Sequence, residues 1–321
     1  MGRFTNFFGQ GKAASAVWIS SSVVFYLLFR AVMDNSTSTN TESLMSSSER
    51  RSRLYDEMSR DVDEHGMKFL QGGETSQSLM LNDIFELRGG YVIPKPKAAD
   101  PPVRANVLYL SPEFSNPISK AVRDIFLPYF DGAIWFQNAS LYHFSMFHAS
   151  HHLTSVKATD AGIEAEASAV KEVARSLCPL KIFLDRVVLT STGVLLGCWQ
   201  VVSGPDPVTI RSKLRNALRH SPEKQLYDPV MLHTSFARIL GHPKVPLEDM
   251  KNSSDLLKFF HELVERVNDK IRGFEATVSE LWYVEEYDVL ALALDGRIKV
   301  RYSNLIFSSK KIRKIGPIYL D

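Results

Sequence analysis

Two segments of the chain carry the same pair of polar side chains, a histidine followed two residues later by a serine. The pairs are His143 with Ser145 and His233 with Ser235. Both segments are otherwise largely apolar, which predicts buried strands, and residues two apart on a strand point to the same face. Imidazole titrates at about pH 6.5, so of two histidines in one cleft one can be neutral and the other protonated. Such a pair suits proton transfer by a general base and a general acid, with the hydroxyls as hydrogen-bond donors.

The repetition of the pair is more informative than either copy. The chain holds nine histidines, so a single His-x-Ser within a core strand is unremarkable. The two copies lie in comparable apolar segments, 141–147 and 230–239, with an amphipathic helix, two strands and another helix predicted between them. This arrangement favours a shared cleft, and the alternative that both segments are simply core strands stays open.

Other histidines and the cysteines point to no metal site. His148, His151 and His152 follow the first pair closely, but they lack a carboxylate or cysteine at a spacing typical of metal ligands. We interpret them as loop residues. Cys178 and Cys198 form neither a metal-ligand spacing nor a disulfide framework, and they can form one bridge or remain free thiols.

The surrounding pattern interleaves helices and strands. Strands joined by hairpins predict an α+β fold with antiparallel sheets rather than a parallel sheet. Each His-x-Ser segment follows a strand–helix unit, which predicts two lobes related by a pseudo-twofold axis, each with an antiparallel sheet flanked by helices. The helices are expected at 117–129, 160–178, 254–271 and from Asp206 onward, and the strands at 105–110, 133–136, 180–190, 193–202 and 274–284. A hairpin that turns at Asp295-Gly296 is expected over 289–302. In the helix that Asp206 opens, the interpreted solvated face consists of Arg211, Lys213, Arg215 and Arg219.

With this order of elements, the two segments resemble the paired motifs of a known family. His143-Phe144-Ser145-Met146 and His233-Thr234-Ser235-Phe236 are similar to the His-x-Thr/Ser-x motifs of the 2H phosphoesterase superfamily, which includes LigT-like RNA 2′,5′ ligases and cyclic nucleotide phosphodiesterases. The resemblance extends over about 103–307, including the opening strand at 107–113 and the Ala-Arg tail of the second motif. Both hydroxyl positions are Ser where Thr is commoner in the family.

The resemblance implies a metal-independent phosphodiesterase without cofactor that hydrolyses a cyclic phosphodiester, of the 2′,3′-cyclic nucleotide or RNA-end type. His143 and His233 would be the catalytic acid and base, in an order that the sequence leaves open. Ser145 and Ser235 would bind the phosphate. The alternative is a catalytically silent fold of the same family that acts as a membrane-anchored binding module.

Further candidates for the substrate have simpler explanations. Arg238 is suited to clamp a phosphate, but by strict alternation it faces away from His233 and Ser235 unless a β-bulge intervenes. Four aromatic residues that could stack on a nucleobase are more simply core residues: Tyr109, Phe147, Trp199 and Tyr283.

The N-terminal part lies outside the resemblance. Residues 13–33 form an apolar run of a length that spans a bilayer, with a cleaved signal peptide and a soluble helix as rivals. Arg3 and Lys12 precede this run, so the positive-inside tendency places the N-terminus in the cytosol and the rest in a lumen or outside the cell. We therefore expect a single-pass protein of the endomembrane system, in the ER, the Golgi or the plasma membrane. Sequons at Asn35, Asn138 and Asn252 are compatible with a glycoprotein.

The resulting organisation is a cytosolic leader, 1–12, a transmembrane anchor, 13–33, a flexible stem and linker, 34–102, a 2H phosphoesterase-like domain, 103–308, and a tail, 309–321. The 321 residues suffice for a domain with a substantial core. The net charge of +2 gives no strong field for nucleic acid or a membrane surface.

Overall fold

The structure is a computed structural model, and it describes residues 45–73, 80–89, 91–244, 252–289, 294 and 296–305. The chain divides into two compact units, Met1–Ser46 and Ser47–Asp321. The fold that follows is that of the second unit. The leader, the expected membrane anchor at 13–33 and the tail lie outside the described residues.

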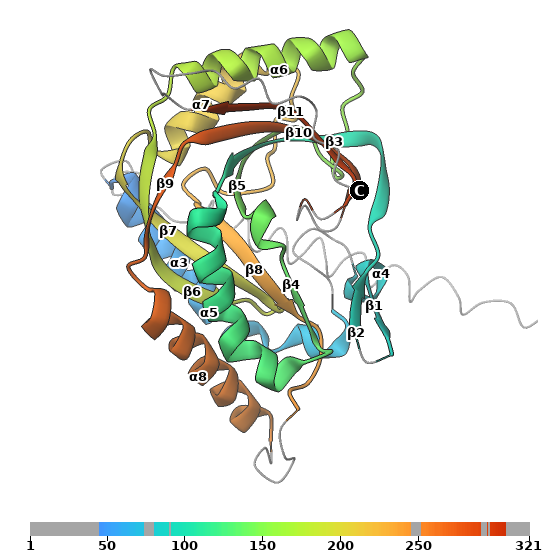
Figure 1. Cartoon of the computed structure of the whole chain (residues 1–321), viewed down its shortest axis with the longest axis vertical. Coiled ribbons are helices and arrows are strands. Elements are labelled where there is room, and N and C mark those ends of the chain that lie inside the picture. The colour runs from blue at the N-terminus through green and yellow to red at the C-terminus, as the bar shows by residue number, and fades with distance from the viewer. Residues whose placement is uncertain are drawn as a thin grey trace, which may run out of the picture. The chain divides into compact units, whose positions relative to one another are not determined.

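Two antiparallel sheets form the framework (Figure 1). The four-stranded sheet has the order β11(Ile298–Leu305), β10(Glu280–Val289), β3(Lys97–Tyr109), β5(His143–Ser150). The five-stranded sheet has the order β4(Ile134–Phe136), β8(His233–Ile239), β7(Val194–Ser203), β6(Leu180–Leu189), β9(Glu275–Val278). A separate hairpin consists of β1(Phe85–Arg88) and β2(Tyr91–Pro94). The expected α+β class with antiparallel sheets is thus confirmed, and the pseudo-twofold relation of the lobes stays a prediction.

Helices cover the two sheets separately. Helices α6(Asp160–Arg175) and α7(Pro207–Ala217) pack against each other, α6 on β10 and β11 and α7 on β5 (Figure 1). Helices α5(Pro112–Phe130) and α8(Ser253–Ile271) pack against each other and on the five-stranded sheet. Side-chain caps begin three of these helices, because Thr159, Asp206 and Asn252 accept backbone N–H groups at the starts of α6, α7 and α8.

The single strand expected over 274–284 is wrong. The chain forms β9 and then β10, with Ser279 between them, and the two strands belong to different sheets. β9 pairs with β6, whereas β10 pairs with β3 and β11. One continuous apolar pattern therefore passes from one sheet to the other, a change of partner that periodicity does not reveal.

The flexible stem expected over 34–102 is corrected for its described residues. Helix α3(Ser47–His65) buries Arg51, Tyr55 and Val62. After it come the 3₁₀ helix η1(Lys68–Gln71) and the short helix α4(Leu81–Ile84), whose Phe69 and Ile84 belong to the main core. The stem was inferred from a composition rich in Ser, Thr and Asn, but a few well-spaced large side chains suffice to dock this part on the sheet. Among the described residues, no helix combines the length and the apolar character needed to cross a membrane.

Candidate active site

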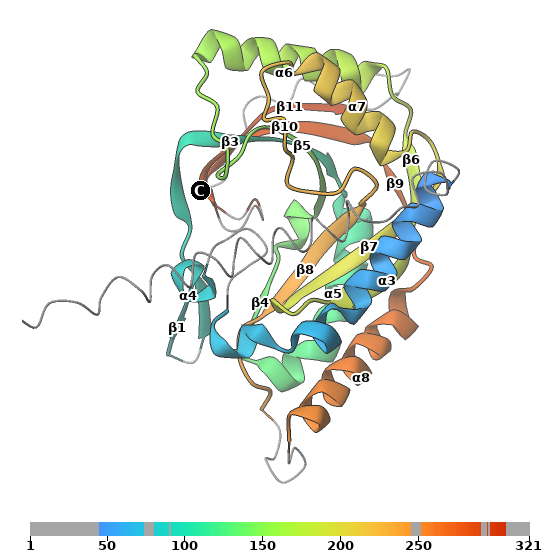
Figure 2. The ribbon, with the colours of Figure 1, turned by 180° about the vertical axis from the view of Figure 1, so that it is seen from behind.

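The two motif strands meet between the sheets. β5 is the edge strand of the four-stranded sheet, β8 is an inner strand of the five-stranded sheet, and the two strands contact each other (Figure 2). Each begins at its motif histidine, His143 or His233. The structure therefore brings into contact two strands whose first residues lie about ninety positions apart in the sequence.

The register of β5 defines its inward face. His143 lies opposite Tyr109 and Ser145 opposite Val107, and β3 residues two apart share a face. An irregularity after Ser145 then places His148 opposite Ala105, on the same face. The interpretation of His148 as a loop residue is therefore wrong, because it lies within β5 and is 2% exposed.

The register of β8 brings Arg238 to the motif face. His233 lies opposite Cys198 and Ser235 opposite Leu196, and after a bulge Arg238 lies opposite Val194. Because residues 194, 196 and 198 share a face of β7, Arg238 shares the face of both motif residues. Strict alternation along the strand would place Arg238 on the opposite face. The β-bulge shifts it by one position and so turns it to the motif face.

Arg238 is enclosed, and among the described residues it makes one side-chain hydrogen bond. It is 9% exposed, and its Nη1 donates a long hydrogen bond of 3.4 Å to the carbonyl of Thr192. Burial lowers the pKa of the guanidinium to about 10, and the nearby Tyr227 raises it by less. The side chain still carries its charge at neutral pH.

His233 is a neutral imidazole at physiological pH. It is 8% exposed, and its ring centroid lies 4.8 Å from that of Tyr227. Burial lowers the pKa of His233 to about 3, with smaller contributions in the same direction from the charges of Arg211 and His143.

His143 is half-buried and has a defined orientation. Its Nδ1 lies 2.8 Å from the carbonyl oxygen of Leu141. A carbonyl only accepts, so Nδ1 carries the hydrogen and Nε2 is the nitrogen directed to other partners. Ser145 is buried at 7% exposure, and Ser235 is half-buried.

Arg211 joins the two motif segments through their backbones, and the interpretation of this residue as part of a solvated helix face is wrong. Its Nε and Nη2 donate to the carbonyls of Met146 and Ser145 at 2.9 and 3.0 Å, and its Nη1 donates to Pro229 at 2.6 Å. Burial lowers the pKa of Arg211 to about 10. It adjoins the apolar stripe of α7, which is the only signal in the sequence for its burial.

The other histidines near β5 form a compact group without metal-site geometry. Burial, followed by the charge of His151, lowers the pKa of His148 to about 3. His151 is 2% exposed, and its two ring nitrogens contact the carbonyl of Lys224 at 3.0 Å and the backbone N–H of Thr154 at 3.1 Å. In the described part of the chain, no group of three or more His, Cys, Asp or Glu residues could hold a metal ion.

The edge of β5 is closed by one side chain. Gln225, in the segment between α7 and β8, accepts from the backbone N–H of His148 at 2.7 Å and donates to the carbonyl of the same residue at 3.1 Å. An amide supplies one donor and one acceptor, as a neighbouring strand would. The contact ties the segment that precedes His233 to the strand that carries His143.

Aromatic side chains adjoin the motif face. Tyr109 is half-buried and stacks on Trp282 with ring centroids 4.0 Å apart. Both lie on the face of His143, since Trp282 is opposite Val107 and Tyr109 is opposite His143. The three other aromatic candidates are buried in the main core, which confirms their interpretation as core residues: Phe147, Trp199 and Tyr283. Trp282 was not among the sequence candidates.

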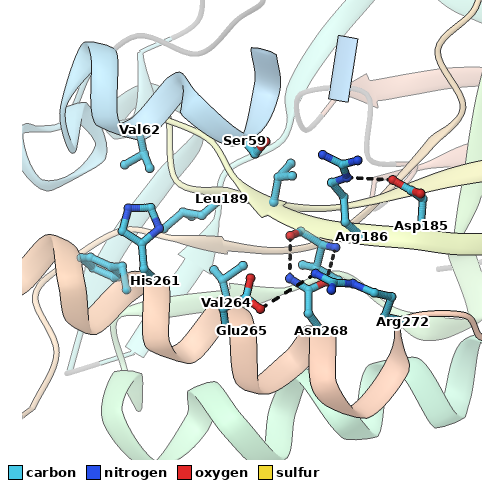
Figure 3. Close-up of a pocket in the computed structure, with 13 residues that line it drawn as sticks. Ser59, Val62, Asp185, Arg186, Leu189, His261, Val264, Glu265, Asn268 and Arg272 are labelled. Atoms are coloured by element: carbon cyan, nitrogen blue, oxygen red, sulfur yellow. Dashed lines mark hydrogen bonds and ion pairs between the residues drawn. The ribbon is translucent and has the colours of Figure 1, made fainter. Parts of the chain in front are cut away.

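A groove of about 400 Å³ lies elsewhere, between α3, the edge of β6 and α8 (Figure 3). Neither motif pair lines it. Within it Asn268 accepts from the backbone N–H of Val187 at 2.7 Å and donates to its carbonyl at 3.1 Å (Figure 3). This amide covers the part of β6 that extends beyond β9.

Cys178 and Cys198 are both free thiols.

Comparison with known proteins gives distant structural similarity. No family model matches the chain, and no curated protein matches it. Among solved structures, TT0787 of Thermus thermophilus is 11% identical, with a TM-score of 0.43 over 65% of this chain and 100% of that one. Escherichia coli LigT in its apo form is 13% identical, with a TM-score of 0.36 over 68% and 95% of the two chains. LigT complexed with 3′-AMP is 14% identical, with a TM-score of 0.36 over 70% and 99%. These similarities leave the activity to be judged from the residues of this chain.

Proposed function

We propose that the chain is a metal-independent phosphodiesterase that hydrolyses a cyclic phosphodiester, of the 2′,3′-cyclic nucleotide or RNA-end type, by two-histidine acid/base catalysis. The observation that carries the proposal is the meeting of two strands from different sheets, each of which begins at the histidine of a His-x-Ser pair. The bulge in β8 adds the guanidinium of Arg238 to the face that His233 and Ser235 share.

His233 is the general base in this scheme. Its imidazole is neutral at pH 7, because burial holds its pKa at about 3, so it offers a lone pair to an attacking water. The water oxygen forms a bond to phosphorus as His233 takes one of its protons. The negative charge of a bound phosphodiester raises the basicity of this imidazole when the proton arrives.

His143 is the general acid. Its Nδ1–H donates to the carbonyl of Leu141, a contact that sets the orientation of the ring, so that Nε2 is the nitrogen that carries the transferred proton. The bond between phosphorus and one ribose oxygen breaks, and His143 gives its proton to that oxygen. The product is a phosphomonoester with one free ribose hydroxyl. The other water proton stays on the phosphate. His233 then loses its proton to solvent and His143 takes one up, which returns the pair to its starting charge.

Three donors on the same faces suit the phosphoryl oxygens. The hydroxyls of Ser145 and Ser235 share the faces of their histidines, and the bulge adds the guanidinium of Arg238. A buried, charged donor is suited to the charge that develops on the phosphoryl group in the transition state. The stacked pair Tyr109 and Trp282 beside His143 offers a face for a nucleobase.

Hydrolysis of 2′,3′-cyclic AMP by the full-length chain tests the proposal. His143→Ala and His233→Ala are each expected to lower kcat about 10²-fold or more, the usual contribution of one proton-transfer partner. His220→Ala, at an exposed position just after α7, is the matched control and should leave the rate unchanged. Turnover that survives both motif substitutions contradicts the assignment.

The same protein decides on the binding-module alternative. A silent module would bind 3′-AMP or 2′-AMP with an affinity that falls in Arg238→Met, yet show no turnover of any 2′,3′-cyclic nucleotide. Calorimetric titration alongside the rate assay separates the two functions. Activity retained in the presence of EDTA is expected for a scheme in which two imidazoles carry both protons.

We also infer that residues 13–33 anchor the chain in an endomembrane with the domain on the lumenal side. The length of the apolar run supports this, and Asn138 and Asn252 are exposed. Alkaline extraction of membranes should leave the full chain in the pellet and release a chain that starts at Ser47. A glycosidase-sensitive mass shift that disappears in Asn138→Gln supports the lumenal side, and its absence at both sequons contradicts it.

A further inference from the structure

Helix α3 lies on the motif face of the five-stranded sheet. Its Tyr55 packs with Val188, Leu196 and Cys198, and Leu196 and Cys198 are the residues opposite Ser235 and His233. Figure 2 shows α3 running along β6 and β7. The helix therefore covers β6 and β7, and β8, which carries the second motif, is the next strand of the sheet.

Tyr55 contacts the backbone at the point where the ladder between β7 and β8 ends. Its hydroxyl lies 2.7 Å from the carbonyl oxygen of Leu232 and 2.8 Å from that of Trp199. It also accepts the N–H groups of the same two residues at 3.2 and 3.3 Å. One hydroxyl can accept two hydrogens while it donates its own to one carbonyl at a time. No apolar ring of the same size could replace these contacts.

Arg51 fixes the same segment one turn earlier along α3. The side chain is fully buried, and its Nε donates to the carbonyl of Val230 at 2.7 Å. Its Nη1 and Nη2 donate to Gln200 on β7 at 2.9 Å and to the Asp206 carboxylate at 2.6 Å. Together with Tyr55, it holds residues 230 and 232 against β7, immediately before His233.

We propose that α3 is part of the active site, with Tyr55 and Arg51 as positioning residues that set the His233 imidazole through the backbone of Val230–Leu232. The inference rests on the function proposed above. A catalytic imidazole must be held to within a fraction of an ångström, and a displacement of about 1 Å can lower a rate about 100-fold. The ladder of β8 begins at His233. Before it, the carbonyl of Leu232 accepts the backbone N–H of Trp199 at 3.0 Å, and the side chains of Tyr55 and Arg51 add to this contact in fixing residues 230–232.

Tyr55→Phe in the full chain tests the proposal. It keeps the ring in the cluster and removes only the hydroxyl. The expected result is a fall in kcat of about tenfold or more, with KM changed less than about threefold, because no phosphate-binding side chain is altered. Val62→Ala is the control, since Val62 is 2% exposed on the same helix two turns further on, in the groove of Figure 3. It loosens the docking of α3 without touching residues 230–232 and should keep kcat within about twofold.

Side-chain NMR of the histidines gives a second readout that needs no activity. The ring signals of His233, identified by their loss in His233→Gln, are expected to shift in Tyr55→Phe, and those of His261 on α8 to stay in place. Unchanged His233 signals with an unchanged kcat overturn the proposal, as does a loss of kcat in Val62→Ala equal to that in Tyr55→Phe. If the wild-type chain turns over no cyclic nucleotide, the proposed function fails, and the NMR comparison decides on the role of α3 alone.

Discussion

Glu286 is a carboxylic acid enclosed in the protein. It lies on β10 opposite Val103 and is 1% exposed, and its Oε2 has no hydrogen-bond partner among the residues that the structure describes. Burial raises the pKa of this carboxyl from 4.5 to about 8, and a backbone contact with Leu294 lowers it by less. The folded chain therefore keeps, at pH 7.5, a proton that the unfolded chain has lost.

The sign and size of the effect follow from proton linkage. Because the folded-state pKa is the higher one, the contribution of Glu286 is full below about pH 4.5 and is lost as the pH rises through about 8. Each pH unit in this window lowers the free energy of unfolding by about 1.4 kcal/mol. The loss of unfolding free energy is about 4 kcal/mol at pH 7.5 and less than about 1 kcal/mol at pH 5.

Glu286→Gln isolates this term, because glutamine has the shape of the protonated acid and no proton to lose. The variant is expected to exceed the wild type in free energy of unfolding by about 4 kcal/mol at pH 7.5 and by less than about 1 kcal/mol at pH 5. Urea unfolding followed by tryptophan fluorescence at the two pH values measures both differences.

Glu275→Gln is the control for the change of side chain, because Glu275 is exposed on β9. Its difference from the wild type should be small and equal at the two pH values. A Glu286→Gln difference that stays constant between pH 5 and pH 7.5 would refute the reasoning, because it would mean that the carboxyl titrates alike in the folded and unfolded chains.

Three further predictions concern the motif region. Arg211→Met removes the donor from two buried carbonyls, those of Ser145 and Met146, and from that of Pro229, and should lower the free energy of unfolding in urea by about 3 kcal/mol or more. The matched change at the exposed Arg219, Arg219→Met, should alter it by less than about 0.5 kcal/mol. Arg238→Met should raise the KM for a 2′,3′-cyclic nucleotide about tenfold or more, since a charged hydrogen bond contributes about 1.5–3 kcal/mol, and an unchanged KM removes this residue from the phosphate site. His148 and His233 stay neutral in the folded chain down to about pH 3 while the unfolded chain takes up protons below about pH 6.5. Each therefore lowers the free energy of unfolding by about 1.4 kcal/mol per pH unit on acidification, and His148→Gln should remove half of that fall in urea titrations below pH 6.5.

Local periodicity predicted much of the framework. Hairpins and amphipathic helices indicated an α+β fold with antiparallel sheets, and the structure has it. Alternation placed Ser145 on the face of His143, as the register of β5 has it. These features depend on residues two, three or four apart, whose relative direction the backbone itself determines.

Features that depend on distant partners could not be predicted in this way. The bulges that turn His148 and Arg238 to the motif faces arise from pairing with β3 and β7, and no local signal marks them. The burial of Arg211 and Arg51 is equally non-local, because each guanidinium is satisfied by carbonyls or side chains from other elements. The local sequence around an arginine beside an apolar stripe is the same whether its guanidinium is solvated or bonded to backbone carbonyls of another element.

The two amides at the sheet edges have a consequence for how copies of this chain meet one another. A strand edge with free N–H and C=O groups invites another chain to add a strand, which is a common route to aggregation. Gln225 and Asn268 occupy both backbone groups of one residue on each edge, His148 on β5 and Val187 on β6. A neighbouring chain that docked there would have to break two hydrogen bonds at each edge before it could form its own. The amides of Gln225 and Asn268 thus replace a neighbouring strand at one residue of each edge and oppose the addition of a strand from another molecule.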